Sequence, residues 1–165
     1  MSSIIKISLV ALLAVFLTAC GNDSSTAIVK QAVAIESGDE CHLCGMIITQ
    51  FPGPKGETFS KHAEQAQKFC STRDMFAYYL QPENKGHTIQ LYVHDMAKSH
   101  WDRPDDTHFT DAKTAWYVIE HSQQGSMGAT LASFSDKEHA NSFAKEFGGR
   151  VIDFTQIDTE LVLNL

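Results

Sequence analysis

Residues 135–154 read SDKEHANSFAKEFGGRVIDF and contain the signals for a helix followed by a strand. The first four residues form a capping box, in which a Ser side chain and the side chain of a Glu three residues later bond backbone N–H groups at a helix start. The pair Gly148-Gly149 indicates where the helix ends, because glycine readily adopts the conformation that closes a helix. We therefore predict a helix through Phe147 and a final strand at residues 151–154.

Two apolar segments precede this helix, and one follows the final strand. Residues 114–120 and 128–134 predict two paired strands, and residues 157–163 predict a short terminal helix. The second half of the chain is therefore expected to run strand, strand, helix, strand.

The first half of the chain shows the same order of signals. Residues 46–51 predict an apolar strand, and residues 57–62, which follow a turn rich in Pro and Gly, predict its hairpin partner. Ser71-Thr72-Arg73-Asp74 resembles a capping box in front of a helix at residues 75–80, which should stop near Pro82. Residues 87–96 then alternate as a strand.

Together the two halves predict an α+β fold made of two tandem ββαβ units, with strands packed against helices. The first unit should cover residues 32–112, beginning with a short strand at residues 32–36 and including a polar loop at residues 98–110. The second unit should cover residues 113–165.

The N-terminus predicts an exported lipoprotein. Residues 1–19 have the features of a signal peptide, and their apolar run is too short to span a bilayer. Leu17-Thr18-Ala19-Cys20 matches a lipobox, so we expect Cys20 to carry the lipid and residues 20–31 to form a lipidated tether. Gly21 is not the Asp that retains lipoproteins at the inner membrane, so the periplasmic side of an outer membrane is favoured.

The composition is that of an ordinary globular protein with a net charge of −7. Cleavage of the signal peptide would remove Lys6 and leave a net charge of −8. No run of Lys and Arg is present, and we therefore expect no nucleic-acid partner.

The cysteine count points to a site other than a simple disulfide. Of the four cysteines, Cys20 is assigned to the lipid, which leaves Cys41, Cys44 and Cys70. An odd number of thiols in an oxidising compartment leaves at least one unpaired, unless it binds a metal or another chain. For Cys70 a buried core cysteine is the simpler interpretation.

The motif Cys41-His42-Leu43-Cys44-Gly45-Met46 carries the clearest chemical signal. A pair of this spacing suits a zinc site, a redox pair or a disulfide, whereas c-type haem would need His after the second Cys. A redox centre usually opens a helix, but an apolar, strand-like run follows this motif. Met46 adds a thioether beside the Cys44 thiol, and soft sulfur ligands select Cu(I); as an isolated residue, Met46 would be interpreted as core.

Other Met and His residues could supply further metal ligands. His94 and Met96 should project from the same face of the strand at residues 87–96, opposite the apolar face, where they could bind one metal. Met127 lies at the mouth of a predicted strand. No catalytic triad, phosphate loop or spaced carboxylate pair is present, and we therefore predict that the protein is not an enzyme.

Several of these segments resemble the NosL family of copper-binding accessory lipoproteins of nitrous oxide reductase. The resemblance rests on residues 40–48 with 51–56, and is supported by residues 69–72, 91–96 and 127–129. It implies two ββαβ units similar to the organomercurial lyase fold. It also implies a periplasmic chaperone that binds Cu(I) and delivers it to apo nitrous oxide reductase, working with an ABC-type complex of the same assembly machinery.

A transfer protein needs an accessible site with few ligands, because the metal leaves by ligand exchange. We therefore expect copper ligands in the order Cys44 and Met46, then Met96 with His94, then Cys41 and Met127. Two alternatives stay open. One is a periplasmic thiol–disulfide oxidoreductase using Cys41 and Cys44, and the other is a partner-binding lipoprotein in which these two cysteines form a disulfide.

Overall fold

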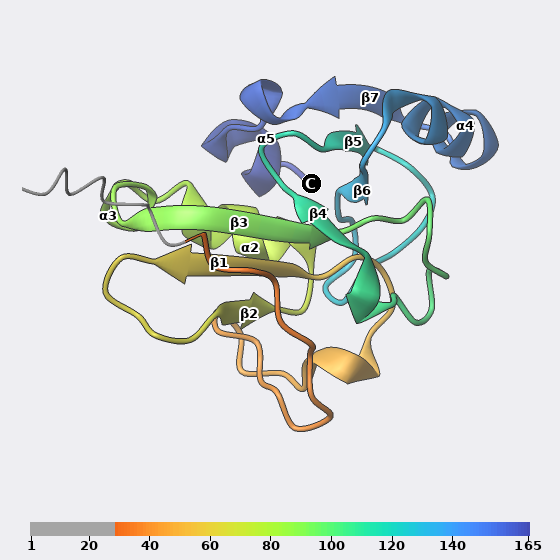
Figure 1. Ribbon diagram of the computed structural model, residues 1–165. Helices are drawn as coiled ribbons and strands as arrows, with labels where there is room; N and C mark the ends of the chain where they lie inside the picture. The colour runs from red at the N-terminus through yellow and green to blue at the C-terminus, as the bar shows by residue number, and fades with distance from the viewer. Residues whose placement is uncertain (1–28) are drawn as a thin grey trace, which may run out of the picture.

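Two antiparallel sheets and their helices form the structure, a computed structural model that describes residues 29–165 (Figure 1). The predicted signal peptide at residues 1–19 and the lipid site Cys20 lie outside the described residues, as does most of the tether at residues 20–31. Among the described residues, no helix combines the length and the apolar character needed to cross a membrane.

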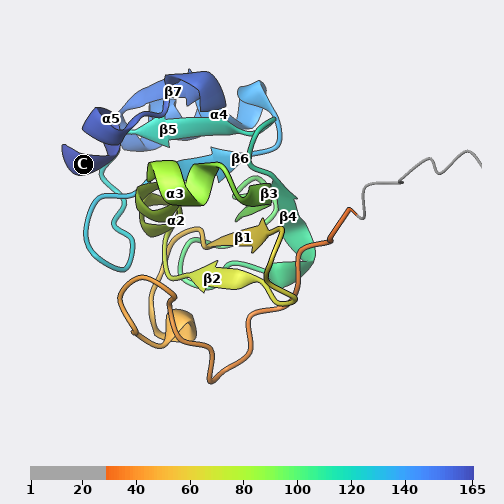
Figure 2. The ribbon, with the colours of Figure 1, turned by 90° about the vertical axis from the view of Figure 1, so that its left-hand side faces the viewer.

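The first unit is built on a four-stranded sheet. Its strands are β1 (Gly56–Ser60), β2 (Gln67–Phe69), β3 (Thr88–His94) and β4 (Phe109–Asp111), in the order β2-β1-β3-β4. Helix α2 (Thr72–Tyr79) packs on β1 and β2, and the short α3 (Pro82–Lys85) leads from α2 into β3. Figure 2 shows α2 lying between this sheet and the second one.

The second unit is built on a three-stranded sheet. Its strands are β5 (Trp116–Ile119), β6 (Ala132–Phe134) and β7 (Arg150–Asp153), in the order β6-β5-β7. Helix α4 (Lys137–Phe147) packs on all three strands, and α5 (Thr159–Leu163) packs on α2 of the first unit. The predicted α+β fold with two successive ββαβ units, β1-β2-α2-β3 and β5-β6-α4-β7, is confirmed.

Both main helices begin at side-chain caps. Ser71 Oγ accepts a hydrogen bond from the Asp74 N–H at 3.0 Å, and this fixes the start of α2. For α4 the cap is Asp136, one residue later than predicted, and its Oδ1 accepts from the His139 N–H at 2.9 Å. Gly149 ends the helix region with a φ of 92°, and a Cβ there would lie 2.2 Å from the Ile119 carbonyl oxygen.

The first two strands predicted in the N-terminal unit are wrong. Residues 46–51 contain a 3-10 turn, η1 (Ile48–Gln50), and β1 pairs instead with β2 and β3. Residues 32–36 are extended but belong to no sheet, because side chains rather than a neighbouring strand bond their backbone. The Val33 N–H donates to Glu57 Oε2 at 3.0 Å, and the Ile35 N–H donates to Asp106 Oδ2 at 2.8 Å.

Smaller differences concern element length. The polar loop at residues 98–110 includes a 3-10 turn, η2 (Asp106–His108), and runs into β4, an edge strand that the sequence did not reveal. Residues 128–131 lie outside β6, and another 3-10 turn, η3 (Phe154–Gln156), connects β7 to α5.

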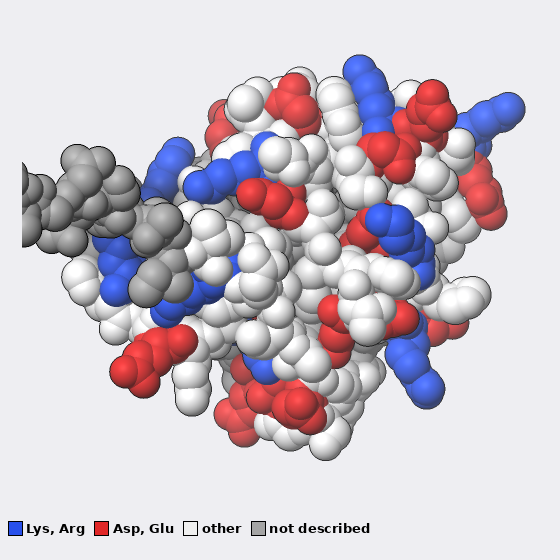
Figure 3. Space-filling model, viewed as in Figure 1, with Lys and Arg blue, Asp and Glu red and all other residues white. Residues whose placement is uncertain are grey.

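One apolar core spans both units, and a smaller one lies beneath α4. The main core includes Phe69 and Phe76 from the first unit and Tyr117 and Ile152 from the second, each at most 2% exposed. Burial of such large side chains is the dominant favourable term in folding. On the face seen in Figure 3, acidic and basic side chains are intermixed over the surface.

Candidate metal centre

The Cys41–Met46 motif folds into a tight loop that returns on itself. The Gly45 N–H donates to the Cys41 carbonyl oxygen and the Cys41 N–H donates to the Met46 carbonyl oxygen, both at 2.8 Å. Gly45 has a φ of 72°, a conformation that glycine adopts without strain. A further bond, from the His42 N–H to the Lys68 carbonyl oxygen at 2.8 Å, fastens the loop to β2.

Cys70 and Asp74 come from the junction between β2 and α2. Cys70 directly follows β2, and Asp74 lies in the first turn of α2. Ser71 Oγ donates to Asp74 Oδ2 at 2.9 Å, so the group that caps the helix also orients the carboxylate. The helix start therefore places a buried thiol and a carboxylate beside the Cys41–Met46 loop.

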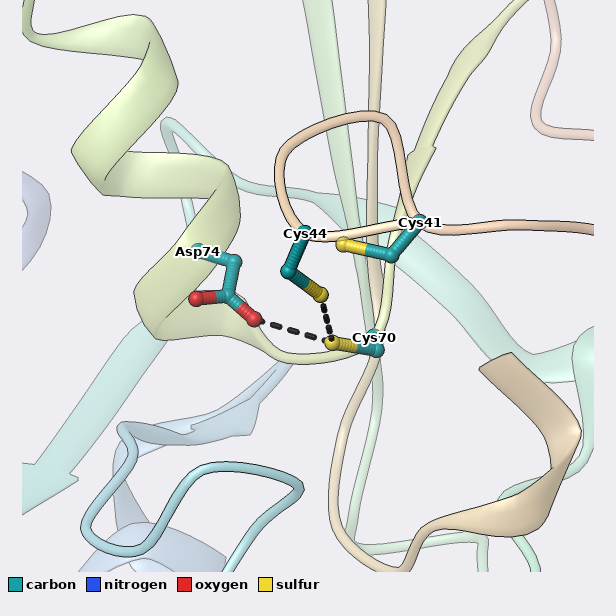
Figure 4. Close-up of side chains that lie close together, drawn as sticks. All are labelled: Cys41, Cys44, Cys70 and Asp74. Carbon is teal, nitrogen blue, oxygen red and sulfur yellow. Dashed lines mark hydrogen bonds between the residues drawn. The ribbon is translucent and has the colours of Figure 1, made fainter. Parts of the chain in front are cut away.

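Four side chains converge to form what we call the thiol cluster: Cys41, Cys44, Cys70 and Asp74 (Figure 4). Their potential ligand atoms all lie within 4.8 Å of one another. The Cys44 and Cys70 sulfurs are 3.4 Å apart, and Cys70 Sγ donates to Asp74 Oδ2 at 3.0 Å. Cys41 and Cys70 are buried, whereas Cys44 is exposed and opens the cluster to solvent.

A loop of the second unit completes the surroundings of Cys70. Ser126 Oγ donates to Cys70 Sγ at 3.1 Å. Ser126 lies in a tight loop that is closed by an isolated β-bridge between Gly125 and Gly128. The next residue, Met127, is 57% exposed. An exposed thioether therefore lies in the loop that contacts the thiol cluster.

The electrostatics of the cluster favour a thiolate at Cys41. The neighbouring Cys70 side chain lowers the pKa of Cys41 to about 5, and backbone N–H groups add to this against the effect of burial. The pKa of Cys70 is raised, first by its hydrogen bond with Cys41 and then by burial. Burial also raises the pKa of Cys44.

Lys55 places a buried cation close to this thiolate. Its Nζ donates to the carbonyl oxygens of Phe51 at 2.7 Å and Pro52 at 2.9 Å, and the residue is 3% exposed. Burial lowers the pKa of Lys55 to about 8, and the charges of Cys70, Asp74 and Cys41 oppose that shift. The ammonium group and the cluster therefore stabilise each other's charged forms.

The six predicted ligands do not all lie together in the structure. Cys41 and Cys44 are in the thiol cluster, and Met46 is half-buried, packed against the main core, with its backbone closing the loop. Met127 is on the adjoining loop. His94 and Met96 are not in the cluster.

His94 and Met96 are held in other surroundings. The Lys55 N–H donates to His94 Nδ1 at 3.0 Å, and His94 Nε2 bonds Asp106 Oδ1 at 2.9 Å. Met96 packs in the smaller core beneath α4. The face of β3 that was expected to be open is covered, since His94 is 1% exposed and Met96 is 9% exposed. Ser133 of β6 also bonds the backbone here: its Oγ donates to the His94 carbonyl oxygen, and its carbonyl oxygen accepts from the Met96 N–H.

Sequence reasoning missed the site roles of four residues: Lys55, Cys70, Asp74 and Ser126. The sequence favours a core role for Cys70 and a capping-box role for Asp74, whereas the cap of α2 is Ser71. The one available signal was that Cys70 comes immediately before a capped helix, where a thiol lies close to the helix start.

A family model described as NosL matches residues 32–162. The chain belongs to the NosL family. Two curated members named copper-binding lipoprotein NosL are similar to it. That of Stutzerimonas stutzeri is 48% identical over 154 residues, covering 93% of this chain and 80% of the relative. That of Achromobacter cycloclastes is 33% identical over 162 residues, covering 96% and 83%.

A solved NosL structure has the same fold. The crystal structure of the copper chaperone NosL from Shewanella denitrificans shares 49% sequence identity with the chain, at a TM-score of 0.79. The match covers 80% of this chain and 98% of that one.

Proposed function

We propose that this NosL-family protein is a membrane-anchored carrier of Cu(I) on the periplasmic side of the outer membrane. It would deliver copper for the maturation of nitrous oxide reductase. The observation that carries the proposal is the thiol cluster, in which three cysteines converge and one of them, Cys44, is exposed. The names of the relatives, copper-binding lipoprotein and copper chaperone, support copper as the cargo.

The donor set suits a soft metal that has to leave again. Thiolates select Cu(I) and Zn²⁺ over hard cations, and three thiols with a carboxylate would also satisfy tetrahedral zinc. Structural zinc sites are closed, whereas Cys44 opens this cluster to solvent. An exposed sulfur gives an acceptor protein a point at which ligand exchange can begin.

We propose Cys44, Cys41 and Cys70 as thiolate ligands, with Met127 as a thioether that closes over the metal and Met46 as a second thioether donor. Asp74 would accept the proton that Cys70 loses, since the two already share a hydrogen bond. His94 and Met96 would need to leave their present partners in order to bind, and we therefore give them no direct contact with copper.

The anchor has a mechanistic part in this proposal. Lipid attached to Cys20 would hold the carrier at the membrane and raise its effective concentration near a membrane-bound partner. The proposed partners are an ABC-type complex of the assembly machinery and apo nitrous oxide reductase as the copper acceptor.

The test is an anaerobic Cu(I) titration of the reduced, detergent-solubilised lipoprotein against a chromophoric Cu(I) chelator. We expect about one copper per chain and an affinity that falls by more than about 100-fold in Cys44→Ser, since even residues that only orient a ligand contribute about 10–100-fold. Met127→Leu should weaken binding, whereas the matched Met96→Leu, in the smaller core, should not. Undiminished affinity in Cys44→Ser would refute the assigned site.

The low pKa of Cys41 is the observation that favours the alternative, a thiol–disulfide oxidoreductase. Such an enzyme needs its nucleophile to reach a substrate disulfide, but the Cys41 side chain is 2% exposed. Catalytic reduction of a model protein disulfide, lost in Cys41→Ser and unaffected by Cu(I), would favour the oxidoreductase over the carrier.

A further inference from the structure

We propose that the protein has a disulfide site between Cys44 and Cys70, and that forming this bond withdraws the site from copper binding. The pairing stands on geometry alone, while its consequence for copper rests on the proposed function. The bond would join the second cysteine of the Cys41–Met46 motif to a cysteine outside that motif.

A contact between two of the three sulfurs favours this pair. The Cys44 and Cys70 sulfurs lie 3.4 Å apart, in van der Waals contact, and Figure 4 shows the Cys44 sulfur directed at that of Cys70. Closing the remaining distance to a bond needs only a small movement of the exposed Cys44 side chain. Cys41 lies in the same group, with its sulfur within 4.8 Å of the other two, so a Cys41–Cys44 bond is the pairing that the test must exclude.

Exposure decides the order of events. Cys44 is the exposed thiol of the cluster, whereas Cys70 is fully buried behind it. An oxidant that arrives from solvent therefore meets Cys44 first. Cys70 is then already in place to resolve the product.

The chemistry is a thiol–disulfide exchange with a disulfide-bonded oxidant, RSSR. Cys44 loses its proton to solvent, and the resulting thiolate attacks one sulfur of RSSR, forming a Cys44–S–S–R mixed disulfide and releasing the first RS⁻. Cys70, having passed its proton to the Asp74 carboxylate at 3.0 Å, attacks Cys44 Sγ and expels the second RS⁻. Two thiols are thus oxidised, RSSR is reduced to two RSH, and the protons lost by Cys44 and Cys70 balance those taken up by RS⁻ through solvent.

The bond would have two physical consequences. It would link the Cys41–Met46 loop covalently to the start of α2, 26 residues away along the chain, and so stabilise the fold by restricting the unfolded chain. It would also leave Cys41 as the one remaining thiol. Cu(I) affinity should then fall by more than about 100-fold, because two direct ligands are lost.

Peptide mapping tests the pairing directly on the full lipoprotein in detergent. The reduced, copper-free protein is treated with oxidised glutathione, its free thiols are alkylated, and it is digested with trypsin. Cleavage after Lys30 and Lys55 puts Cys41 and Cys44 on one peptide, and cleavage after Lys68 and Arg73 puts Cys70 on another. We expect these two peptides to be linked, with the alkyl group on Cys41.

The cysteine variants supply matched controls. Cys41→Ser should still form the linked peptides, and neither Cys44→Ser nor Cys70→Ser should do so. An unlinked, alkylated Cys70 peptide together with an unalkylated Cys41–Cys44 peptide would overturn the proposal, as would a link that survives in Cys44→Ser. Unfolding of the wild-type protein provides a second measurement, since its thermal midpoint should rise on oxidation, and an unchanged midpoint counts against the bond.

Copper separates this inference from the proposed function. Loading with Cu(I) before oxidation should protect all three thiols, and the oxidised protein should bind Cu(I) more than about 100-fold more weakly than the reduced one. If the reduced protein binds no Cu(I), the proposed function fails while the mapped disulfide stands. If copper binds but the two peptides are never linked, the inference fails alone.

Discussion

Lys55 can influence the candidate metal site although it is not one of the proposed ligands. Its ammonium group bonds two backbone carbonyls of the Pro/Gly-rich turn and lies close enough to the thiol cluster to influence its charges. The same residue bonds His94 through its backbone N–H. A buried lysine is costly unless such partners are present, so this position combines a structural and an electrostatic role.

Lys55→Met should therefore raise the pKa of the Cys41 thiol, because the thiolate loses a nearby positive charge. The change is measured in the copper-free protein, by the pH dependence of the ultraviolet absorbance of the thiolate at about 240 nm. It should also cost about 1–3 kcal/mol of stability, since two carbonyl groups lose their partner. Lys145→Met, on the exposed side of α4, is the control and should change neither quantity. An unshifted thiol titration in a folded Lys55→Met protein would remove the electrostatic role.

The residues of the site were only half predictable. The motif spacing gave Cys41 and Cys44, because both lie in one short loop whose geometry is local. Cys70 is 26 residues beyond Cys44 and reaches it through the pairing of the Cys41–Met46 loop with β2, where the His42 N–H donates to the Lys68 carbonyl oxygen. Nothing in a single sequence reports such a pairing, and so the third thiol and Asp74 were interpreted as core and cap.

Among the elements, those fixed by local chemistry were predicted best. Helices α2 and α4 have side-chain caps at their starts, and each cap acts within three residues of the chain. Strands β2 and β4 have three residues each, too few for an alternating pattern, and their existence depends on partners elsewhere. The open face assigned to β3 failed for the same reason, since Lys55 and Asp106 from other parts of the first unit cover His94 and the core beneath α4 covers Met96.

The end of α4 gives a prediction at this scale. Gly149→Ala should destabilise the protein by about 2 kcal/mol or more, because the residue has a positive φ and its Cβ would collide with the Ile119 carbonyl oxygen of β5. Gly38→Ala, at a turn with no atom within 4 Å of the new Cβ, should stay within about 0.5 kcal/mol of wild type. Urea unfolding followed by circular dichroism measures both. Equal midpoints for the two variants would contradict the account of the α4–β7 turn.

At the scale of the whole molecule, residues 29–36 join the predicted anchor to the folded domain. Side chains from across the first unit bond this segment: Glu57 and Asp106 accept its N–H groups, and Tyr92 and Lys68 donate to its carbonyl oxygens. The segment continues into the loop that bears Cys41. The polar groups of the first unit therefore fix the described start of the chain, residues 29–36, ahead of the thiol cluster.

Glu57 makes this attachment sensitive to pH. Its side chain is fully buried, Oε2 accepts the Val33 N–H, and Oε1 has no partner among the described residues. Burial raises the pKa of Glu57 to about 7; Lys68 opposes the shift, and Asp106 and Asp39 add to it. The ordinary value is 4.5, so between these two values the folded state binds more protons than the unfolded chain. Stability should therefore fall as pH rises from about 5 to 8.

Glu57→Gln should remove that loss, because an amide keeps an oxygen for the Val33 N–H and has no charge to bury. At pH 8 we expect the variant to be more stable than wild type by on the order of 2 kcal/mol. Near pH 5, where wild-type Glu57 is protonated in the fold, the two should be close. Urea unfolding across this pH range measures the difference. The control is the exposed Glu64→Gln, in which stability should change with pH as it does in wild type. If the stability of Glu57→Gln also falls with pH as in wild type, the pH dependence belongs to other groups. The attachment of residues 29–36 then does not depend on the charge of Glu57.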